Sequence, residues 1–403
     1  MASPRIAIIG GGPGGLTLAR LLKIHNIPFR LFELDESSTS RPQGGTLDIH
    51  GNSGQLALKA AGLFTEFEKY ARREGEEFKI LDEAGNMGWH DTGSDEPGMD
   101  RPEIDRRDLR KILLESLDEG MVNWGKKVIR VSEDPSSTPL IPQFTVELES
   151  GEKESGFELI VGADGAWSRV RPLLTDAKPF YSSVTSIEAR ISSIDTKYPE
   201  LSARVGQGTC FQFGQPGVTI GSQRNSDGSI RTYAQFKADE DWVEKCGIDW
   251  SDVEGSKKAL IDLKYPGLEA LGKEFILKSE RALIVRPLYM LPVDLKWDTR
   301  PGVALIGDAA HLMTPFAGIG VNLALADALD LSDAIRSHYE QNVDWTTALR
   351  KFEEKMLERA HAEAVDTLKN LNSFMSPTGY EDMVKFFKET IMGPQEGPDG
   401  EEA

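Results

Sequence analysis

A glycine-rich turn near the N-terminus constrains this chain more than any other feature, and it consists of Gly10, Gly11, Gly12, Pro13, Gly14 and Gly15. The turn contains the spacing G-x-G-x-x-G. A continuous apolar run, 6–9, precedes it, and apolar residues at helical spacing follow it, which predicts a buried strand, a tight turn and a helix. A second apolar run at 29–32 completes a βαβ unit.

An acidic residue after this unit indicates what the turn binds. Glu33 lies eighteen residues after Gly15, at the end of the second apolar run. The glycines would let the backbone approach a pyrophosphate at a helix N-terminus, while the acid would accept hydrogen bonds from a ribose diol. Because a carboxylate repels a 2′-phosphate, the pocket favours FAD or NAD over NADP. A purely structural glycine turn is the weaker alternative in this context.

Composition excludes several classes of protein. The chain has 403 residues, which at about 150 residues per domain predicts two domains plus an appendage. Its 46 basic and 65 acidic residues give a net charge of −19, which argues against nucleic acid and anionic membranes as partners. Only two cysteines, Cys210 and Cys246, are present. With no long apolar segment or signal peptide, we expect a cytoplasmic protein in a reducing compartment.

The hydrophobicity pattern changes along the chain, and this change predicts discontinuous domains. Residues 176–285 alternate polar and apolar side chains, typical of a half-exposed antiparallel sheet. The buried-strand style returns at 303–306. We therefore predict a cofactor domain made of 1–75, 101–175 and 286–335, with a substrate domain made of 76–100 and 176–285 inserted into it.

The C-terminal part of the chain is predicted to be helical. Apolar residues recur at spacings of three and four over 346–375, which predicts one long helix. We expect the segment 340–390 to pack across both domains of a monomer rather than to bind a partner. The tail 393–403 has the composition of a disordered segment.

Two later turns share the context of the first, since each follows a buried apolar run. One spans Gly162–Arg171 and holds Asp164-Gly165, and the other spans Gly307–Pro315 and holds Gly307-Asp308. In this order with the glycine turn, they resemble the motifs of the class A flavoprotein aromatic hydroxylases, over about residues 1–335. The resemblance implies an α/β fold: a Rossmann-like FAD-binding domain of the GR2 type with a parallel sheet, an inserted antiparallel-sheet substrate domain and a long C-terminal helix.

Three more segments, Arg41–His50, Glu103–Arg110 and Ala317–Asn322, resemble the TetX-type flavin monooxygenases that inactivate tetracycline. The resemblances imply these cofactor-binding residues: Gly10, Gly12, Pro13, Gly14, Gly15, Glu33, Arg41, Asp48, Arg106, Asp164, Asp308, Gly318, Gly320, Val321 and Asn322. Arg41 would receive NADPH, and Asp164 would border both FAD and the pyridine nucleotide. A helix that starts at about Leu323 would stabilise negative charge on the reduced flavin through its N-terminus.

The resemblance also implies a reaction. Because only one dinucleotide fingerprint occurs, NAD(P)H would dock transiently and reduce the flavin. A flavin C4a-hydroperoxide formed from O2 would then insert one oxygen atom into an aromatic or polycyclic secondary metabolite, such as a tetracycline-like compound, a polyketide or an alkaloid. A flavin-dependent halogenase is an alternative, although none of the seven tryptophans lies in a W-x-W-x-I-P segment. A non-catalytic homologue that only binds flavin is a second alternative.

Substrate contacts are predicted from rough correspondence with the TetX pattern: Glu188, Arg231, Pro315, Phe316 and Gly318. That family has glutamine and histidine where this chain has Glu188 and Arg231, which makes tetracycline itself a doubtful substrate. Surface salt bridges are an equal alternative for these two residues. We assign no side chain a certain catalytic role, because the flavin would carry the chemistry. We predict no metal site, and a packing or hydrogen-bonding role for His311 and His50.

Overall fold

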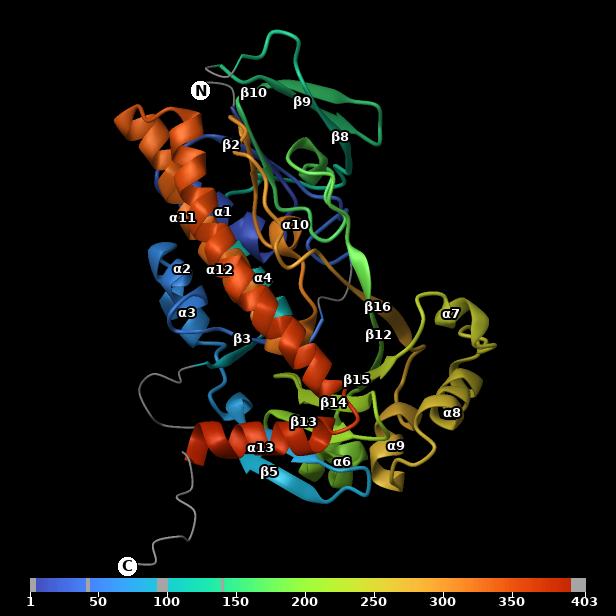
Figure 1. The fold of residues 1–403 in the computed structure, drawn as a ribbon. Helices are drawn as coiled ribbons and strands as arrows, with labels where there is room; N and C mark the ends of the chain where they lie inside the picture. Colours follow the sequence, from blue (N-terminus) through green and yellow to red (C-terminus); the bar gives the residue numbers. More distant parts are fainter. Residues whose placement is uncertain (1–4, 41–43, 93–100, 139–140, 393–403) are drawn as a thin grey trace, which may run out of the picture. The chain divides into compact units, whose positions relative to one another are not determined.

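The computed structural model describes residues 5–40, 44–92, 101–138 and 141–392 (Figure 1). The predicted tail 393–403 and Arg41 lie outside the described residues. The chain forms two compact units, each built from three segments. Unit 1 consists of Met1–Arg72, Glu96–Ser182 and Tyr289–Leu368, and unit 2 consists of Arg73–Asp95, Ser183–Leu288 and Lys369–Ala403. The functional domain boundaries given above stay a prediction.

A five-stranded parallel sheet forms the centre of unit 1. Its strands lie in the order β17-β11-β1-β2-β7, and every pair is parallel. They are β1 (Ile6–Ile9), β2 (Phe29–Phe32), β7 (Val122–Asn123), β11 (Leu159–Gly162) and β17 (Val303–Leu305). All four residues of β1 and of β11 are buried, as expected of continuous apolar runs covered on both faces. The predicted βαβ unit is confirmed by the parallel pairing of β1 with β2.

Helices and short turns complete unit 1 (Figure 1). They are α1 (Pro13–Ile24), α2 (Gly54–Ala60), α3 (Phe64–Glu68), α4 (Arg106–Glu115), η2 (Arg171–Leu173), α10 (Asp308–His311), η3 (Pro315–Ala317), α11 (Gly320–Gln341) and most of α12 (Trp345–Phe374). Gly14 lets α1 approach α11 closely, since a Cβ there would lie 3.2 Å from the carbonyl oxygen of Ala324. The apolar faces of these helices and the sheet bury one continuous core.

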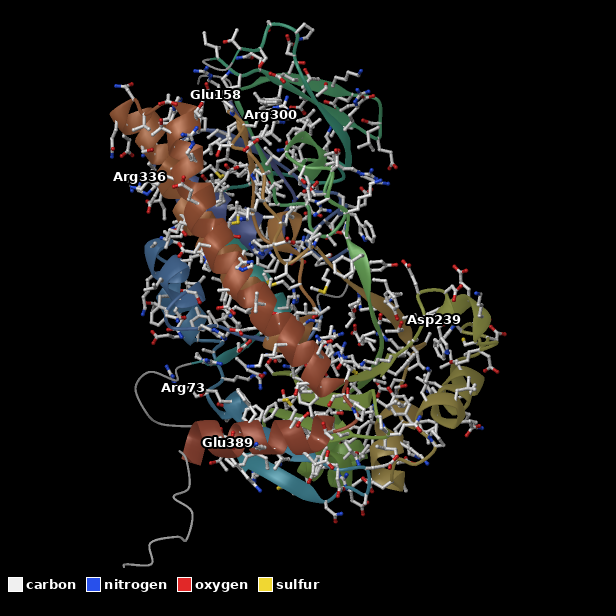
Figure 2. All side chains as sticks on the ribbon, in the orientation of Figure 1. Arg73, Glu158, Asp239, Arg300, Arg336 and Glu389 are labelled. Carbon is white, nitrogen blue, oxygen red and sulfur yellow. The ribbon has the colours of Figure 1, made fainter. Side chains whose placement is uncertain are left out.

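Two smaller sheets also belong to unit 1. Strands β3 (Thr46–Asp48) and β6 (Glu103–Asp105) form an antiparallel pair. Strands β8 (Val128–Glu133), β9 (Phe144–Leu148) and β10 (Lys153–Phe157) form an antiparallel sheet of their own, which the sequence pattern did not separate from the parallel one. Next to this sheet, Glu158 (labelled in Figure 2) pairs with Arg5 and accepts a hydrogen bond from Tyr339 of α11.

Unit 2 is built on a seven-stranded sheet with the order β16-β12-β15-β14-β13-β4-β5. The strands are β4 (Phe78–Leu81), β5 (Met87–Asp91), β12 (Phe180–Ile191), β13 (Thr209–Phe213), β14 (Val218–Arg224), β15 (Ile230–Lys237) and β16 (Ile284–Met290). The predicted antiparallel arrangement holds for β12–β15, β15–β14 and β14–β13. The pair β13–β4 is parallel, because β4 enters the sheet from the separate segment Arg73–Asp95.

The two faces of this sheet differ in chemistry. On one face Ile187, Ala234 and Phe236 pack with Leu260 and Tyr265 in a buried apolar cluster. Because side chains alternate along a strand, the residues between the apolar ones point to the opposite face, which is largely polar.

The helical elements of unit 2 are η1 (Glu74–Glu76), α5 (Ile194–Lys197), α6 (Pro199–Val205), α7 (Trp242–Lys245), α8 (Val253–Lys264), α9 (Ala270–Leu277) and α13 (Gly379–Met392).

The long C-terminal helix is confirmed. It was predicted over 346–375, and α12 runs continuously from Trp345 to Phe374. Its residues up to Leu368 belong to unit 1, and those from Lys369 onward belong to unit 2. Within the described ranges, every helix is too short or too polar to cross a membrane.

Candidate functional site

Three turns that are far apart in the sequence meet at one edge of the parallel sheet. The strands β1, β11 and β17 are spatial neighbours, and their last residues lie in register. The glycine turn follows β1, the turn with Asp164 follows β11, and the turn with Asp308 follows β17. Because all three strands run parallel, their carboxyl ends share one edge, which is where open α/β sheets bind ligands.

The glycines of the turn after β1 are needed for different structural reasons. A side chain at Gly10 would collide with the carbonyl oxygen of Ala163, and one at Gly15 would collide with the carbonyl oxygen of Gly10. Gly10 also has a positive φ of 106°, which favours glycine. A Cβ at Gly12, in contrast, would meet no atom of the described residues within 4 Å. The space in front of Gly12 is therefore open to a ligand.

The N-terminus of α1 is suited to an anion. Gly12 is the N-cap residue, Pro13 occupies the first turn, and within the described part of the chain no side chain caps this helix. Unpaired N–H groups and the helix dipole favour negative charge at such an end.

Glu33 is held in place by backbone donors. Its side chain is buried, and its two carboxylate oxygens accept hydrogen bonds from the N–H groups of Gly11 (2.6 Å) and Asp35 (2.9 Å). Each carboxylate oxygen retains a further acceptor position, as a ribose hydroxyl requires. Nearby, Arg110 pairs with Asp35 at 3.1 Å, a contact that the sequence pattern did not indicate.

A second group of predicted residues gathers where α11 begins. Asn322 links this helix to the segment after β3: its Nδ2 donates to the carbonyl oxygen of Asp48 (2.9 Å), and its Oδ1 accepts from the N–H of His50 (2.9 Å). The Asp48 carboxylate lies 2.8 Å from Nε2 of His50. Gly318 has a positive φ of 66° and faces the same carboxylate. The structure thus brings Asp48, Gly318 and Asn322 together.

The start of α11 also exposes a helix N-terminus. The helix begins at Gly320, three residues before the predicted start at Leu323, and Gly320, Val321 and Asn322 form its first turn. Among the described residues, no side chain caps this end. Like α1, it favours negative charge in front of it.

The carboxylates of the other two turns are electrostatically perturbed. The pKa of Asp308 is raised, because loss of hydration outweighs the attraction of His311, Arg106 and Arg171. Asp308 is nevertheless exposed to solvent, so many protein atoms lie near its carboxylate while one side of it stays open. Burial likewise raises the pKa of Asp164. Its Oδ2 accepts from the N–H of Arg169 at 2.6 Å, whereas Oδ1 is buried with no hydrogen-bond partner among the described residues.

Arg171, which was not among the predicted site residues, links the turn of Asp164 to the turn of Asp308. Its guanidinium donates to the carbonyl oxygen of Ala166 in the Asp164 turn and to that of Ala309 (3.0 Å) in the Asp308 turn. The side chain is buried. Its position as the last residue of the Gly162–Arg171 motif was the available signal.

Arg106 reaches the site through the small antiparallel sheet. It is the first residue of α4, directly after β6, and its N–H donates to the carbonyl oxygen of Gly45 (3.0 Å) beside β3. A Cβ at Gly44 would lie 3.3 Å from the Arg106 side chain, so the glycine lets the two segments pass closely. The pairing of β3 with β6 therefore places Arg106 beside Gly45 at one end of β3, whereas Asp48 lies opposite Glu103 at the other end. The positive charge of Arg106 also acts on the carboxylate of Asp308.

These groups together match the chemistry of FAD. Two uncapped helix N-termini favour the anionic parts of a ligand, Glu33 supplies an acceptor for a ribose, and the open space at Gly12 admits a diphosphate. The orphaned Oδ1 of Asp164 and the exposed carboxylate of Asp308 offer acceptors for ligand hydroxyl or N–H groups. The residues present therefore fit this cofactor.

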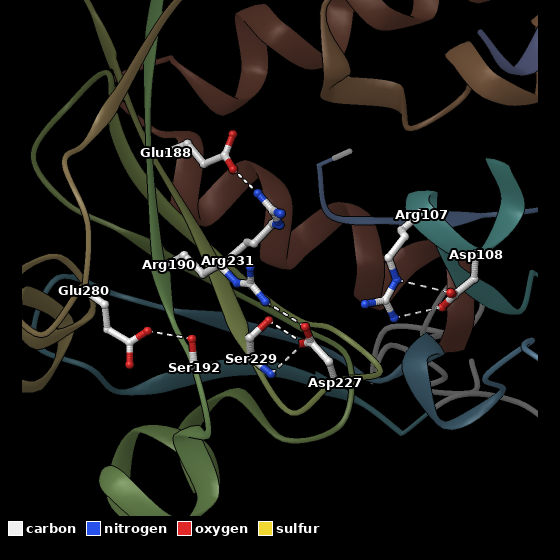
Figure 3. A network of polar contacts seen from close by, with 9 residues as sticks. All are labelled: Arg107, Asp108, Glu188, Arg190, Ser192, Asp227, Ser229, Arg231 and Glu280. Carbon is white, nitrogen blue, oxygen red and sulfur yellow. Dashed lines mark hydrogen bonds and ion pairs between the residues drawn. The ribbon is translucent and has the colours of Figure 1, made fainter. Parts of the chain in front are cut away.

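The predicted substrate residues fall in both units. Glu188 on β12 and Arg231 on β15 lie in unit 2 and form an ion pair across the polar face of the sheet (Figure 3). Arg286 of β16 also contacts Glu188, with Nε 3.1 Å from the carboxylate. Glu188 and Arg231 are 4% and 7% exposed, so the pair is a salt bridge but not a surface one.

The remaining predicted substrate residues lie in unit 1. Pro315 and Phe316 belong to the short helix η3, and Gly318 ends it in a left-handed conformation. This segment joins α10, which carries Asp308, to α11.

His311 makes a buried contact instead of facing an open site. Its Nε2 lies 2.6 Å from the carboxylate of Asp327 on α11, and Asp327 also accepts a hydrogen bond from Arg359 of α12 (2.8 Å). Neither Asp327 nor Arg359 was predicted, because residues from three separate helices carry no shared local spacing.

Comparison with known proteins identifies the family of this chain and its cofactor. The chain matches the FAD binding domain family over residues 4–259 and 297–364. It is 33% identical over 375 residues to the monooxygenase asqM of Emericella nidulans, covering 82% of this chain and 83% of that protein. FAD is therefore the cofactor, and the predicted resemblance to flavoprotein monooxygenases is confirmed.

Two solved structures share the fold. HpxO of Klebsiella pneumoniae, complexed with FAD and uric acid, has a TM-score of 0.74 at 21% identity, covering 95% of this chain and 92% of its own. The tetracycline destructase Tet(55) has a TM-score of 0.72 at 18% identity, covering 97% and 95%. At these identities the two structures support the fold alone.

Proposed function

The chain belongs to the FAD binding domain family, and on this premise we propose that it is an NAD(P)H-consuming monooxygenase that inserts one oxygen atom from O2 into an aromatic or polycyclic metabolite. The observation that carries this proposal is the meeting of three turns at the carboxyl edge of β1, β11 and β17. FAD, when bound, supplies the acceptor for hydride and the chemistry that activates oxygen.

The chain's own residues hold and orient the cofactor in this proposal. The N-terminus of α1, with Gly12, Gly14 and Gly15, would bind the diphosphate, and Glu33 would bind the ribose. Asp48, Arg106, Asp164 and Asp308 would contact other polar atoms of FAD. The first turn of α11, with Gly320, Val321 and Asn322, would stabilise negative charge on the reduced ring. Residues that hold the ring and exclude water would be the protein's main contribution.

The reductant would bind without a dinucleotide fold of its own. In the described residues of unit 2, four of the strand pairs are antiparallel and the pair β13–β4 is parallel, and Gly206-Gln207-Gly208 is followed by strand β13, not by a helix. This supports transient docking of NAD(P)H. Arg41, the residue proposed to receive it, lies outside the described residues.

The substrate class rests on two supporting observations. HpxO, which shares the fold, holds the flat heterocycle uric acid together with FAD, and Tet(55) is a tetracycline destructase. In this chain the buried pair of Glu188 and Arg231 offers charged anchors, while Pro315, Phe316 and Gly318 offer mainly apolar contacts. Each set by itself suits part of a flat ring system that carries hydroxyl or carbonyl groups.

The test is a screen of fused-ring phenolics for faster NADPH oxidation by the FAD-loaded protein, with mass spectrometry of the products under 18O2. A product heavier by one labelled oxygen atom supports the proposal. A product that instead gains a halogen in the presence of chloride or bromide supports the halogenase alternative. Flavin that is never reduced faster with any compound supports the non-catalytic homologue.

A further inference from the structure

A buried polar network lies behind the turn that presents Asp308. Asp327 of α11 is 0% exposed, and its Oδ2 accepts a hydrogen bond from the N–H of Gly307 (3.0 Å) and lies 2.6 Å from Nε2 of His311. Its other oxygen, Oδ1, accepts from Arg359 of α12 (2.8 Å). The Asp327 carboxylate therefore connects both ends of α10 to Arg359 of α12.

The turn depends on such support. Gly307 has a positive φ of 60°, and the helix that it starts, α10, is only four residues long, with no cap from any side chain that the structure describes. A helix of this length has little stability of its own in water. The contacts of Asp327 with Gly307 and His311 clamp the first and last parts of this turn, and Asp308 lies between them.

The Asp327 carboxylate depends on the other members of the network. A buried carboxylate without partners is costly, and Asp327 avoids this cost because His311 contacts one of its oxygens and Arg359 the other. Burial raises its pKa, but His311, Arg359 and the N–H of Gly307 more than offset this and lower it overall. Burial lowers the pKa of His311, but Asp327 and Asp308 more than offset this and raise it overall.

Arg359 extends the network to a second acid on the same helix. Its other guanidinium nitrogen, Nη1, lies 2.8 Å from Asp330, which also pairs with Lys355 at 2.6 Å. Arg359 thus forms a two-pronged contact with Asp327 and Asp330, one helical turn apart on α11. A lysine at this place could satisfy one of the two acids but not both.

We propose that Arg359 and His311 are positioning residues which, through Asp327, hold the Gly307–Asp308 turn in the conformation that binds FAD. The inference rests on the proposed contact between Asp308 and the cofactor. It makes α12 a determinant of cofactor affinity, acting through the packed side chains between it and Asp308.

The test measures the dissociation constant of FAD from purified full-length apoprotein, by the change in flavin fluorescence on binding. Arg359→Met should weaken FAD binding by about fivefold or more. Arg350→Met, an exposed arginine on the same helix, should change it by less than about twofold. Arg359→Lys should show an intermediate loss, and His311→Leu should resemble Arg359→Met. Thermal unfolding of each apoprotein shows whether the variant is folded.

A double-mutant cycle separates positioning from general destabilisation. If Arg359 acts through Asp308, Arg359→Met should weaken FAD binding much less in an Asp308→Ala background, which has no side-chain acceptor, than in the wild type. Equal loss in both backgrounds would overturn the inference. If Arg359→Met does not fold, Arg359→Lys supports the same cycle.

The outcomes distinguish this inference from the proposed function. Wild-type affinity in Asp308→Ala would refute the contact on which the inference rests. Weak binding by Asp308→Ala together with wild-type binding by Arg359→Met and His311→Leu would refute the inference alone. None of these measurements requires NAD(P)H, oxygen or a substrate, so failure to find turnover affects only the proposed function.

Discussion

Two glycines in the same turn should respond in opposite ways to substitution by alanine. Gly12 has φ −76° and ψ −179°, a conformation that alanine adopts freely, and its added Cβ would meet no atom within 4 Å in the part of the chain that the structure describes. Gly15 lies in the first turn of α1, where a Cβ would collide with the backbone oxygen of Gly10. A carbonyl oxygen at the end of a buried strand cannot move aside as a flexible side chain can.

The expected magnitudes follow from these environments. Gly12→Ala loses some N-cap preference but gains about 0.4–1 kcal/mol from a less flexible unfolded chain, so the apoprotein should change by less than about 1 kcal/mol. Its methyl group would occupy the space proposed for the diphosphate, which should weaken FAD binding at least about tenfold, or about 1.4 kcal/mol. Gly15→Ala should destabilise the apoprotein itself by about 1–3 kcal/mol through overpacking.

The assay combines thermal unfolding of each apoprotein by circular dichroism with FAD titration by flavin fluorescence. Gly12→Ala should keep the melting temperature and lose affinity, while Gly15→Ala should lower the melting temperature before any cofactor is added. Wild-type FAD affinity in Gly12→Ala would refute the placement of the diphosphate. An equal drop in melting temperature for both variants would refute the packing argument.

Three further outcomes are expected. Arg171→Met should leave the carbonyl oxygens of Ala166 and Ala309 without their donor and lower both the melting temperature and FAD affinity, by about 1–3 kcal/mol in stability, which a thermal scan and a titration would check. In native protein at pH 8, Ellman's reagent should react with Cys246 but not with Cys210, whose pKa burial raises to about 12, and both should react in guanidinium; rapid reaction of two thiols would contradict the buried position. Phe236→Ala should cost about 3–5 kcal/mol in urea unfolding, because this fully buried ring packs on Trp242, whereas Phe386→Ala, on an exposed ring, should cost far less.

Local patterns predicted the parts of the site that lie within one motif. The βαβ unit, the strands before each turn and the long α12 all follow from apolar spacing, which depends only on neighbours a few residues away. The segment with Asn322 was predicted from its likeness to a family motif, and the structure shows that its side chain bonds to the segments of Asp48 and His50.

Contacts between motifs were not predicted. The hydrogen bonds of Arg171 to two separate turns, and the meeting of His311, Asp327 and Arg359, join residues up to 138 positions apart with no spacing rule between them. The burial of Glu188 and Arg231 was also missed, because alternation along a strand says which residues share a face but not whether that face is covered.

The sequence by itself determined the parallel-sheet unit, the positions of the three turns and a cofactor of the FAD or NAD type, because strand burial, glycine conformations and a terminal carboxylate are local properties. Resemblance to a known family then separated FAD from NAD. Only the tertiary structure decided that the three turns share one edge and that α12 braces one of them through Asp327. Which charges meet in a core depends on strand order and helix packing, and these emerge only when the whole chain has folded.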